Sequence, residues 1–145
     1  MKHDVSLDLQ GQLISLIRAF GLHRLEQTPC GQNVTVTEAH ALMELSPEQP
    51  LSQSDLVQQL GLEKSSVSRL VRILEKRGWI VRSRHEPDRR LVQILLSTAG
   101  QQAAEQLAAA RRKKFDRVLA AIPKAQRTQV CESLDILLEA IRASD

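Results

Sequence analysis

A run of polar side chains between residues 64 and 72 has the composition of a surface that hydrogen-bonds nucleic-acid bases and phosphates. Serine hydroxyls bond bases of either kind, and an arginine fork pairs with the O6 and N7 of guanine. The outward residues are Lys64, Ser65, Ser66, Ser68, Arg69 and Arg72. Apolar residues Val67, Leu70, Val71 and Leu74 recur at helical spacing and predict one helix that leaves those six residues outward. We expect the serines and Arg69 to face bases, and Lys64 and Arg72 to hold phosphates.

The segment before this run predicts a second helix that would support the first. Ser52 and Asp55 have the spacing of a capping box at a helix start, and Gly61 permits the positive φ of a tight turn. Two short helices joined by such a turn form a helix-turn-helix, whose second helix enters the DNA major groove. At the start of the supporting helix, Ser52 and Gln53 are expected to add phosphate contacts.

Two apolar stretches after this pair predict a β-hairpin, and hence a winged helix-turn-helix. Residues 79–84 and 91–96 have strand composition, and a polar tip with Pro87 separates them. Arg90 is expected to enter the minor groove, whose narrow form concentrates negative potential. Asp88 would then orient an arginine, while Arg84 and Arg89 contact phosphates or stay exposed. The alternative is an ordinary turn in which Asp88 satisfies backbone groups.

Positive charge is concentrated in this part of the chain. Residues 61–90 contain nine basic and four acidic residues, a net charge of +5 within a chain of net +3. A local basic field on a nearly neutral body suits double-stranded DNA. A solvated charged surface is the alternative.

Amphipathic helices are predicted before and after the winged helix-turn-helix. Their expected ranges are 5–27, 38–45, 98–122 and 124–143. The apolar surface of these helices exceeds what a small winged domain can cover, so we expect them to pack between two chains. A symmetric dimer would place its two recognition helices about 34 Å apart, one turn of DNA. A three-helix bundle within one chain is the alternative. Cys131 is expected to pack within the last helix.

Length, composition and missing motifs restrict the domain number, the location and the functional classes that remain. With 145 residues, one domain spanning 1–145 is expected. No membrane span or signal segment is apparent, so a cytoplasmic location is expected. Cys30 and Cys131 predict no disulfide framework. The absence of a Gly-rich phosphate loop, a zinc-protease motif or a nucleophile elbow predicts that the chain is not an enzyme and holds no cofactor.

The order of elements, with three local motifs, resembles the MarR family of bacterial winged-helix transcriptional regulators. The motifs are residues 60–71, residues 74–80, and Asp88-Arg89-Arg90 followed by Leu95 and Ser97. The resemblance implies a mainly α (α+β) fold in which about 35–97 form the DNA-binding winged helix-turn-helix. Residues 1–34 and 98–145 would form dimerisation helices. It also implies a homodimer that binds a pseudo-palindromic operator, usually represses, and responds to a small-molecule effector.

Two features depart from the family pattern. Glu63 stands where the family has a small N-capping residue, so its charge would face the DNA side. The chain has no tyrosine, which weakens a peroxide-sensing mechanism. A metal- or redox-responsive regulator remains an alternative, because His23, Glu26, Cys30, Glu38 and His40 are ligand types that suit zinc. We expect no metal there. A winged-helix protein-interaction module that does not read DNA is the other alternative.

Overall fold

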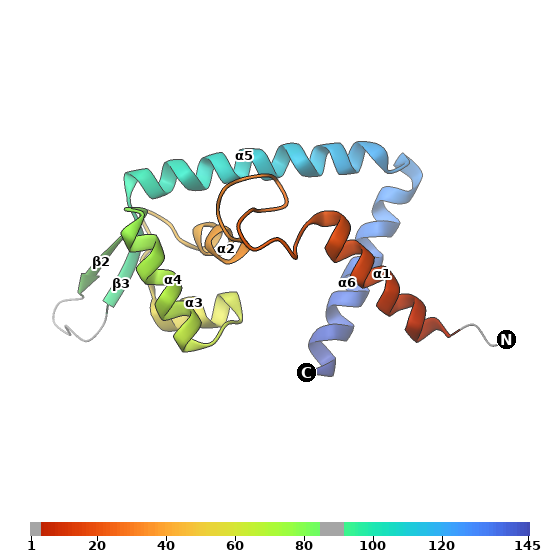
Figure 1. Ribbon diagram of the computed structural model, residues 1–145, viewed down its shortest axis with the longest axis horizontal. Coiled ribbons are helices and arrows are strands. Elements are labelled where there is room, and N and C mark those ends of the chain that lie inside the picture. The colour runs from red at the N-terminus through yellow and green to blue at the C-terminus, as the bar shows by residue number, and fades with distance from the viewer. Residues whose placement is uncertain (1–3, 85–91) are drawn as a thin grey trace. The chain divides into compact units, whose positions relative to one another are not determined.

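The computed structural model describes residues 4–84 and 92–145. Figure 1 shows the elements along the chain. They are α1 (Val5–Phe20), α2 (Val36–Glu44), β1 (Leu51–Ser52), α3 (Gln53–Leu60), α4 (Lys64–Lys76), β2 (Ile80–Arg84), β3 (Val92–Leu96), α5 (Thr98–Ala121), the 3-10 turn η1 (Lys124–Gln126) and α6 (Arg127–Ser144). The chain divides into two compact units, Met1–Ala110 and Arg111–Asp145. The predicted fold class, a mainly helical winged helix-turn-helix, is confirmed.

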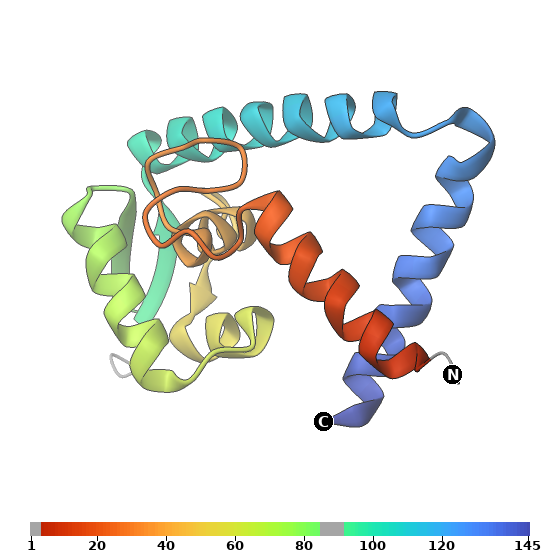
Figure 2. The same ribbon diagram turned by 45° about the vertical axis from the view of Figure 1, so that its right-hand side comes forward.

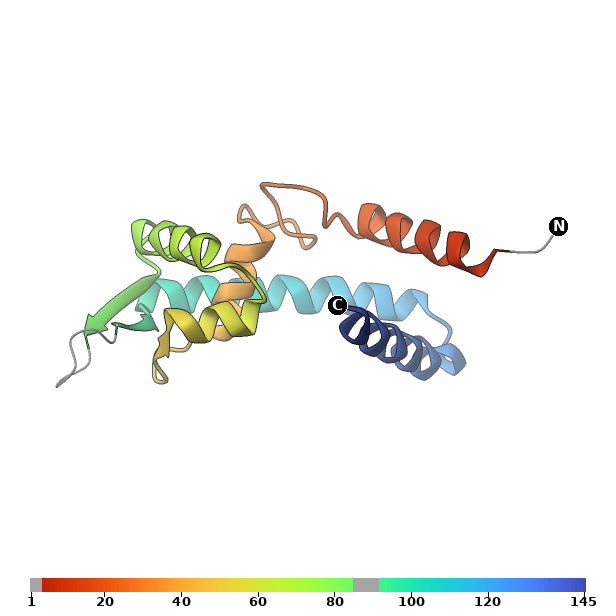
Figure 3. The same ribbon diagram turned by 90° about the horizontal axis from the view of Figure 1, so that it is seen from below.

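The three strands of the first unit form one antiparallel sheet in the order β1-β3-β2. In the hairpin, Ile80 pairs with Leu96 and Arg84 with Val92. Figure 3 shows this hairpin extending beyond α3 and α4. Leu51 of β1 pairs with Ile94. The sequence analysis missed β1, because two residues after a proline-containing stretch carry no strand periodicity.

The core of the first unit lies between α2, α3, α4 and the sheet. Val67, Val71 and Leu74 of α4 are fully buried, as are Leu56 of α3 and Ile94 of β3. Leu107 extends this core onto α5. Burying such a side chain contributes about 1.5–3 kcal/mol, so the apolar stripe predicted for α4 is the contact that fixes which of its faces points outward.

Several helix ends differ from the sequence expectation by a few residues. Helix α1 ends at Phe20 rather than near residue 27, because Gly21 adopts a left-handed φ of 88° and closes the helix with its N–H on the Ile17 carbonyl. Helix α2 begins at Val36, where Thr35 and Glu38 form a capping box. The last predicted helix is divided into η1 and α6.

Helix α5 starts against the end of α4. The Ser97 hydroxyl donates to the Gly78 carbonyl at 2.6 Å and accepts the Gly100 N–H at 3.0 Å. Gly100 is buried, and a Cβ atom there would lie 2.8 Å from the Trp79 carbonyl carbon and closer still to its oxygen. Only a glycine therefore lets α5 approach the backbone of Trp79 this closely.

Gly100→Ala is expected to lower the free energy of unfolding by about 1–3 kcal/mol, because backbone atoms must shift to relieve overpacking. Urea unfolding followed by the fluorescence of Trp79, the single tryptophan, measures this. Gly11→Ala is the matched control, since a Cβ atom at Gly11 meets nothing within 4 Å. It should leave stability unchanged or raise it by up to about 1 kcal/mol. Equal losses in the two variants would contradict the close-approach explanation.

Helices α1 and α6 contain no buried residue. Cys131 of α6 is exposed, so its predicted packing is wrong. Within the described residues, every helix falls short of the length or apolarity needed to cross a membrane.

Candidate nucleic-acid interface

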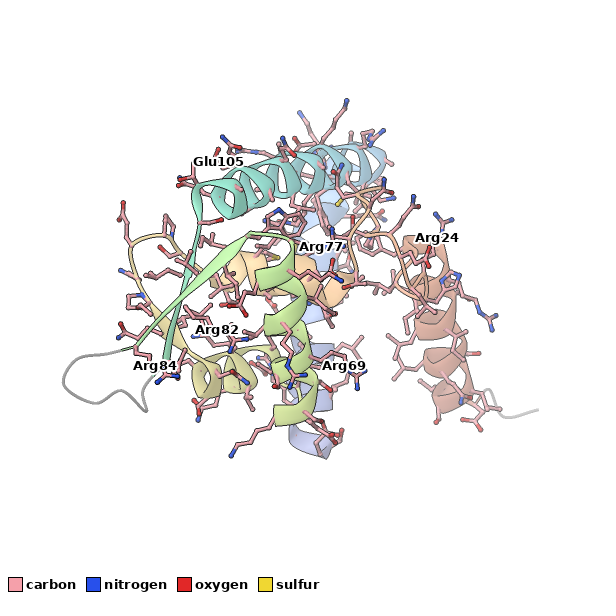
Figure 4. All side chains as sticks on the ribbon, turned by 60° about the vertical axis from the view of Figure 1, so that its left-hand side comes forward. Arg24, Arg69, Arg77, Arg82, Arg84 and Glu105 are labelled. Atoms are coloured by element: carbon pink, nitrogen blue, oxygen red, sulfur yellow. The ribbon has the colours of Figure 1, made fainter. Side chains whose placement is uncertain are left out.

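The outward face of α4 carries the residues predicted to meet bases and phosphates. Lys64, Ser65, Ser66, Arg69 and Arg72 are exposed, whereas Ser68 is half-buried. Figure 2 shows α4, in green, with one side free of the other described elements of its unit, and Figure 4 shows Arg69 projecting from it. Among the described residues, no ion pair engages Lys64, Arg69 or Arg72. Their charges are therefore available to a polyanion.

The turn between α3 and α4 is built as the sequence predicts. Gly61 adopts φ 63°, and its N–H bonds the Val57 carbonyl. Glu63 is the N-cap of α4 and makes no side-chain capping bond. The first-turn N–H groups of α4 therefore receive no hydrogen bond from the Glu63 side chain.

The start of α3 carries the predicted capping box. The Asp55 N–H donates to Ser52 Oγ at 3.0 Å, and the Ser52 N–H donates to Asp55 Oδ2 at 2.8 Å. Ser52 and Gln53 are both half-buried. The bonds from the Ser52 backbone and side chain lower the pKa of Asp55 below its ordinary value of 3.8.

This lowered pKa predicts how the α3 cap responds to acid. The stabilisation from ionised Asp55 is fully present above the unfolded-state pKa and is lost as the pH falls through the lower folded-state pKa. Thermal unfolding measured from about pH 6 to about pH 2 should therefore give wild type a higher midpoint temperature than Asp55→Asn near pH 6. The difference in midpoint temperature should shrink as the pH falls. A gap that stays constant over this range would mean that the Asp55 charge does not support the cap.

Two arginines of the basic segment, residues 61–90, are held in ion pairs that the sequence did not predict. Arg77 Nη2 lies 3.2 Å from Glu38 Oε2, and its guanidinium lies 4.8 Å from the centre of the Trp79 ring. Arg82 Nη2 lies 3.0 Å from Glu75 Oε2. Arg84 of β2 is exposed. These pairs lower the free positive charge near α4 and, among the described residues, leave it on Lys64, Arg69, Arg72, Lys76 and Arg84.

Glu38 is the most deeply buried member of this arrangement, with 5% of its side chain exposed. Its Oε2 also accepts the Thr35 N–H at 3.2 Å. A buried carboxylate needs such partners because desolvation disfavours its charge. The residue thus ties the start of α2 to the end of α4, across 39 positions of sequence. No local pattern points to this contact.

A small cleft of about 270 Å³ runs beside the candidate interface. It is lined by residues from the start of α2 and from α4, including Thr35, Thr37, Ser66 and Arg69. The exposed Thr37 is therefore close to two predicted base-facing residues, which sequence reasoning did not bring together.

The predicted wing residues Asp88, Arg89 and Arg90 lie outside the described residues. The metal alternative finds no support in the described part: among residues 4–84 and 92–145, no three His, Cys, Asp or Glu side chains are grouped to hold an ion. Cys30 is half-buried, and its Sγ lies 3.1 Å from Thr28 Oγ1.

Comparisons with known proteins agree with this arrangement. Residues 34–92 match the MarR family. Over 62 residues the chain is 39% identical to the uncharacterized HTH-type transcriptional regulator YwhA of Bacillus subtilis, a match that covers 43% of this chain and 45% of that protein. The chain thus matches less than half the length of this relative.

Solved structures share the fold over nearly the whole chain. Streptococcus pneumoniae FabT, solved in complex with DNA, has a TM-score of 0.80 at 17% identity, with 97% of this chain and 99% of FabT covered. A probable transcriptional regulator from Pseudomonas aeruginosa has a TM-score of 0.70 at 25% identity, with 92% and 96% covered. The winged helix-turn-helix of residues 34–92 thus matches the MarR family, and the fold of nearly the whole chain is shared with these solved proteins.

Proposed function

We propose that the chain is a sequence-specific DNA-binding transcriptional regulator. In this proposal it represses as a homodimer on a pseudo-palindromic operator and responds to a small-molecule effector. The observation that carries the proposal is the exposed Ser/Arg/Lys face of α4, which stands on a fully buried apolar stripe. A helix so anchored is presented rigidly, as major-groove reading requires.

The residue roles follow from position and chemistry. Ser65, Ser66, Ser68 and Arg69 read base edges. Lys64 and Arg72, at the flanks of this face, hold phosphates, as do Ser52 and Gln53 at the start of α3. Arg84 extends the phosphate contacts along β2. In the wing, Arg90 enters the minor groove, Asp88 orients an arginine and Arg89 contacts a phosphate.

Uncovered apolar side chains support the homodimer. On α6, Val130, Leu134, Leu138 and Ile141 form a stripe at helical spacing and are all exposed. Helix α1 likewise exposes Leu9, Leu16 and Ile17. Large exposed apolar patches mark interaction sites. In the proposal, residues 1–34 and 98–145 carry the dimer contacts and residues 35–97 carry the DNA contacts.

Selection of bound fragments from a genomic library, followed by electrophoretic shift and footprinting, tests the proposal. The expected result is protection of two half-sites about one helical turn apart. If α4 instead served protein interaction alone, no genomic fragment would be enriched, and the proposal would fall.

Arg69→Ala is expected to weaken operator binding by about 1–3 kcal/mol, the cost of one lost bidentate base contact. Titration of a labelled operator by fluorescence anisotropy measures it. Arg82→Ala is the matched control, since the Arg82 guanidinium is held by Glu75 and lies outside the α4 face and the proposed dimer contacts, and it should bind as wild type. Sedimentation should show that both variants keep the wild-type oligomeric state. An equal loss in both would refute the specific role of Arg69.

A further inference from the structure

Glu63, which directly precedes α4, is the single acidic residue of the segment 61–74. The other charged residues of this segment are Lys64, Arg69 and Arg72. Glu63 is exposed, and its side chain makes no capping bond. Within residues 4–84 and 92–145 no ion pair engages it. Its carboxylate oxygens therefore keep their lone pairs for a donor outside the chain.

The backbone of Glu63 is held in place on both sides. Its carbonyl accepts the Val67 N–H at 3.0 Å, and the Val67 side chain is fully buried. On the other side, Leu62 packs against the core of the first unit. The Cα atom of Glu63 therefore keeps one position relative to α4. A side chain that selects a base needs such a fixed support, because a displaced group loses the geometry of its hydrogen bond.

A carboxylate at this place accepts hydrogen bonds but cannot donate them, and this restricts the bases that it can meet. Residues at the start of a recognition helix contact base edges in the major groove. There guanine presents the acceptors N7 and O6, and thymine presents the acceptor O4 and a methyl group. Adenine has its N6 donor beside the acceptor N7, whereas cytosine presents the N4 donor without an acceptor. Cytosine is therefore the base that best matches an ionised glutamate.

We propose that Glu63 selects cytosine at one position in each operator half-site, a role that rests on the proposed function. The negative charge also repels phosphates, whatever the sequence of the duplex. This repulsion is offset only where the N4 amino group of cytosine donates to the carboxylate. Glu63 thus lowers the affinity for other sequences more than the affinity for the operator, and so raises the ratio between the two.

The experiment selects bound duplexes from a randomised DNA library with the full chain, as wild type, Glu63→Gln and Glu63→Ala, and sequences them. Wild type should favour cytosine at one position of each half-site by at least about fivefold. Glu63→Gln should change that preference to adenine, because an amide donates to N7 and accepts from N6. Glu63→Ala should leave the position without a preference. Both variants should bind a random duplex at least about threefold more tightly than wild type, because a repulsive charge is removed.

Glu44→Gln is the matched control, since it removes an exposed negative charge at the last residue of α2. It should keep the base preferences and the random-duplex affinity of wild type. Thermal unfolding of each variant separates a structural role from a specificity role. If Glu63 only stabilised the start of α4, Glu63→Gln would lower the midpoint temperature and weaken binding to all sequences alike, with base preferences unchanged. That result would overturn the proposal.

The outcomes distinguish base selection by Glu63 from DNA binding itself. If wild type enriches no sequence, the proposed function falls and the role of Glu63 falls with it. If wild type enriches a motif that Glu63→Gln and Glu63→Ala reproduce at every position, DNA binding stands and the role of Glu63 alone is overturned. A position that depends on Glu63 but selects a base other than cytosine would contradict the assigned hydrogen bond.

Discussion

Operator binding is expected to weaken by about a thousandfold or more when the salt concentration rises from about 50 to about 200 mM. Each phosphate that a cation neutralises releases condensed counterions, and added salt opposes that release. Lys64 and Arg72 beside Arg69 on α4, together with Arg84 on β2, supply four cations per chain without an ion pair among the described residues. Two chains with wing contacts would neutralise about 6–10 phosphates.

The measurement is a plot of the logarithm of the operator association constant against the logarithm of salt concentration. Its slope should lie between about −5 and −9, since each phosphate contributes about −0.9. Thermal unfolding followed by Trp79 fluorescence at the same salt concentrations is the control that the fold is unchanged. A slope near zero would contradict DNA binding through this face. A double variant, Lys64→Ala with Arg72→Ala, should make the slope shallower by about 3–4 if both chains lose both contacts.

The combined variant Leu134→Glu with Leu138→Glu is expected to convert the proposed homodimer to monomers and to abolish two-site operator binding. These side chains are 44% and 48% exposed in the single chain, and the proposal buries them against a second copy. Losing two leucine burials in each of two chains removes about 6 kcal/mol or more, on the order of 10⁴-fold in the dimer constant. The introduced carboxylates add a desolvation cost.

Analytical ultracentrifugation measures the loss of the dimer, and an electrophoretic mobility shift with operator DNA measures the loss of two-site binding. Ile136→Glu is the matched control: Ile136 lies on the opposite side of α6 by helical spacing and is 70% exposed. It should leave both the dimer and the shift unchanged. If the double variant stays dimeric, the α6 stripe does not form the interface. If it becomes monomeric yet protects both half-sites as before, the dimer is not needed for DNA binding.

Features that depend on neighbours three or four positions apart were predictable. The capping box of Ser52 and Asp55, the turn at Gly61 and the inward stripe of α4 all follow from i to i+3 and i+4 spacing. The same stripe fixes the outward face, so most of the candidate DNA surface was assigned before the fold was known. The resemblance to the MarR family rested on these local motifs and is confirmed.

Interactions between distant positions were not predictable from such patterns. The ion pair of Arg77 with Glu38 and the strand pair of Leu51 with Ile94 each join separate elements. The basic segment was therefore counted as more freely charged than it is, and Glu38 entered only as one of five residues in the zinc alternative. Residues 21–27 were assigned to the first helix, because the end of that helix depends on the left-handed geometry at Gly21.

Local features were predictable and long-range contacts were not, for a simple physical reason. Helix periodicity, capping and charge placement are local properties of the chain, and they alone specified a recognition helix with a Ser/Arg/Lys face. Tertiary packing decided which arginines remain unpaired, why Gly100 must be a glycine, and which residues of α2 lie beside the outward face of α4. Those features arise only when elements far apart in sequence are brought into contact, because desolvation and steric exclusion act on spatial neighbours.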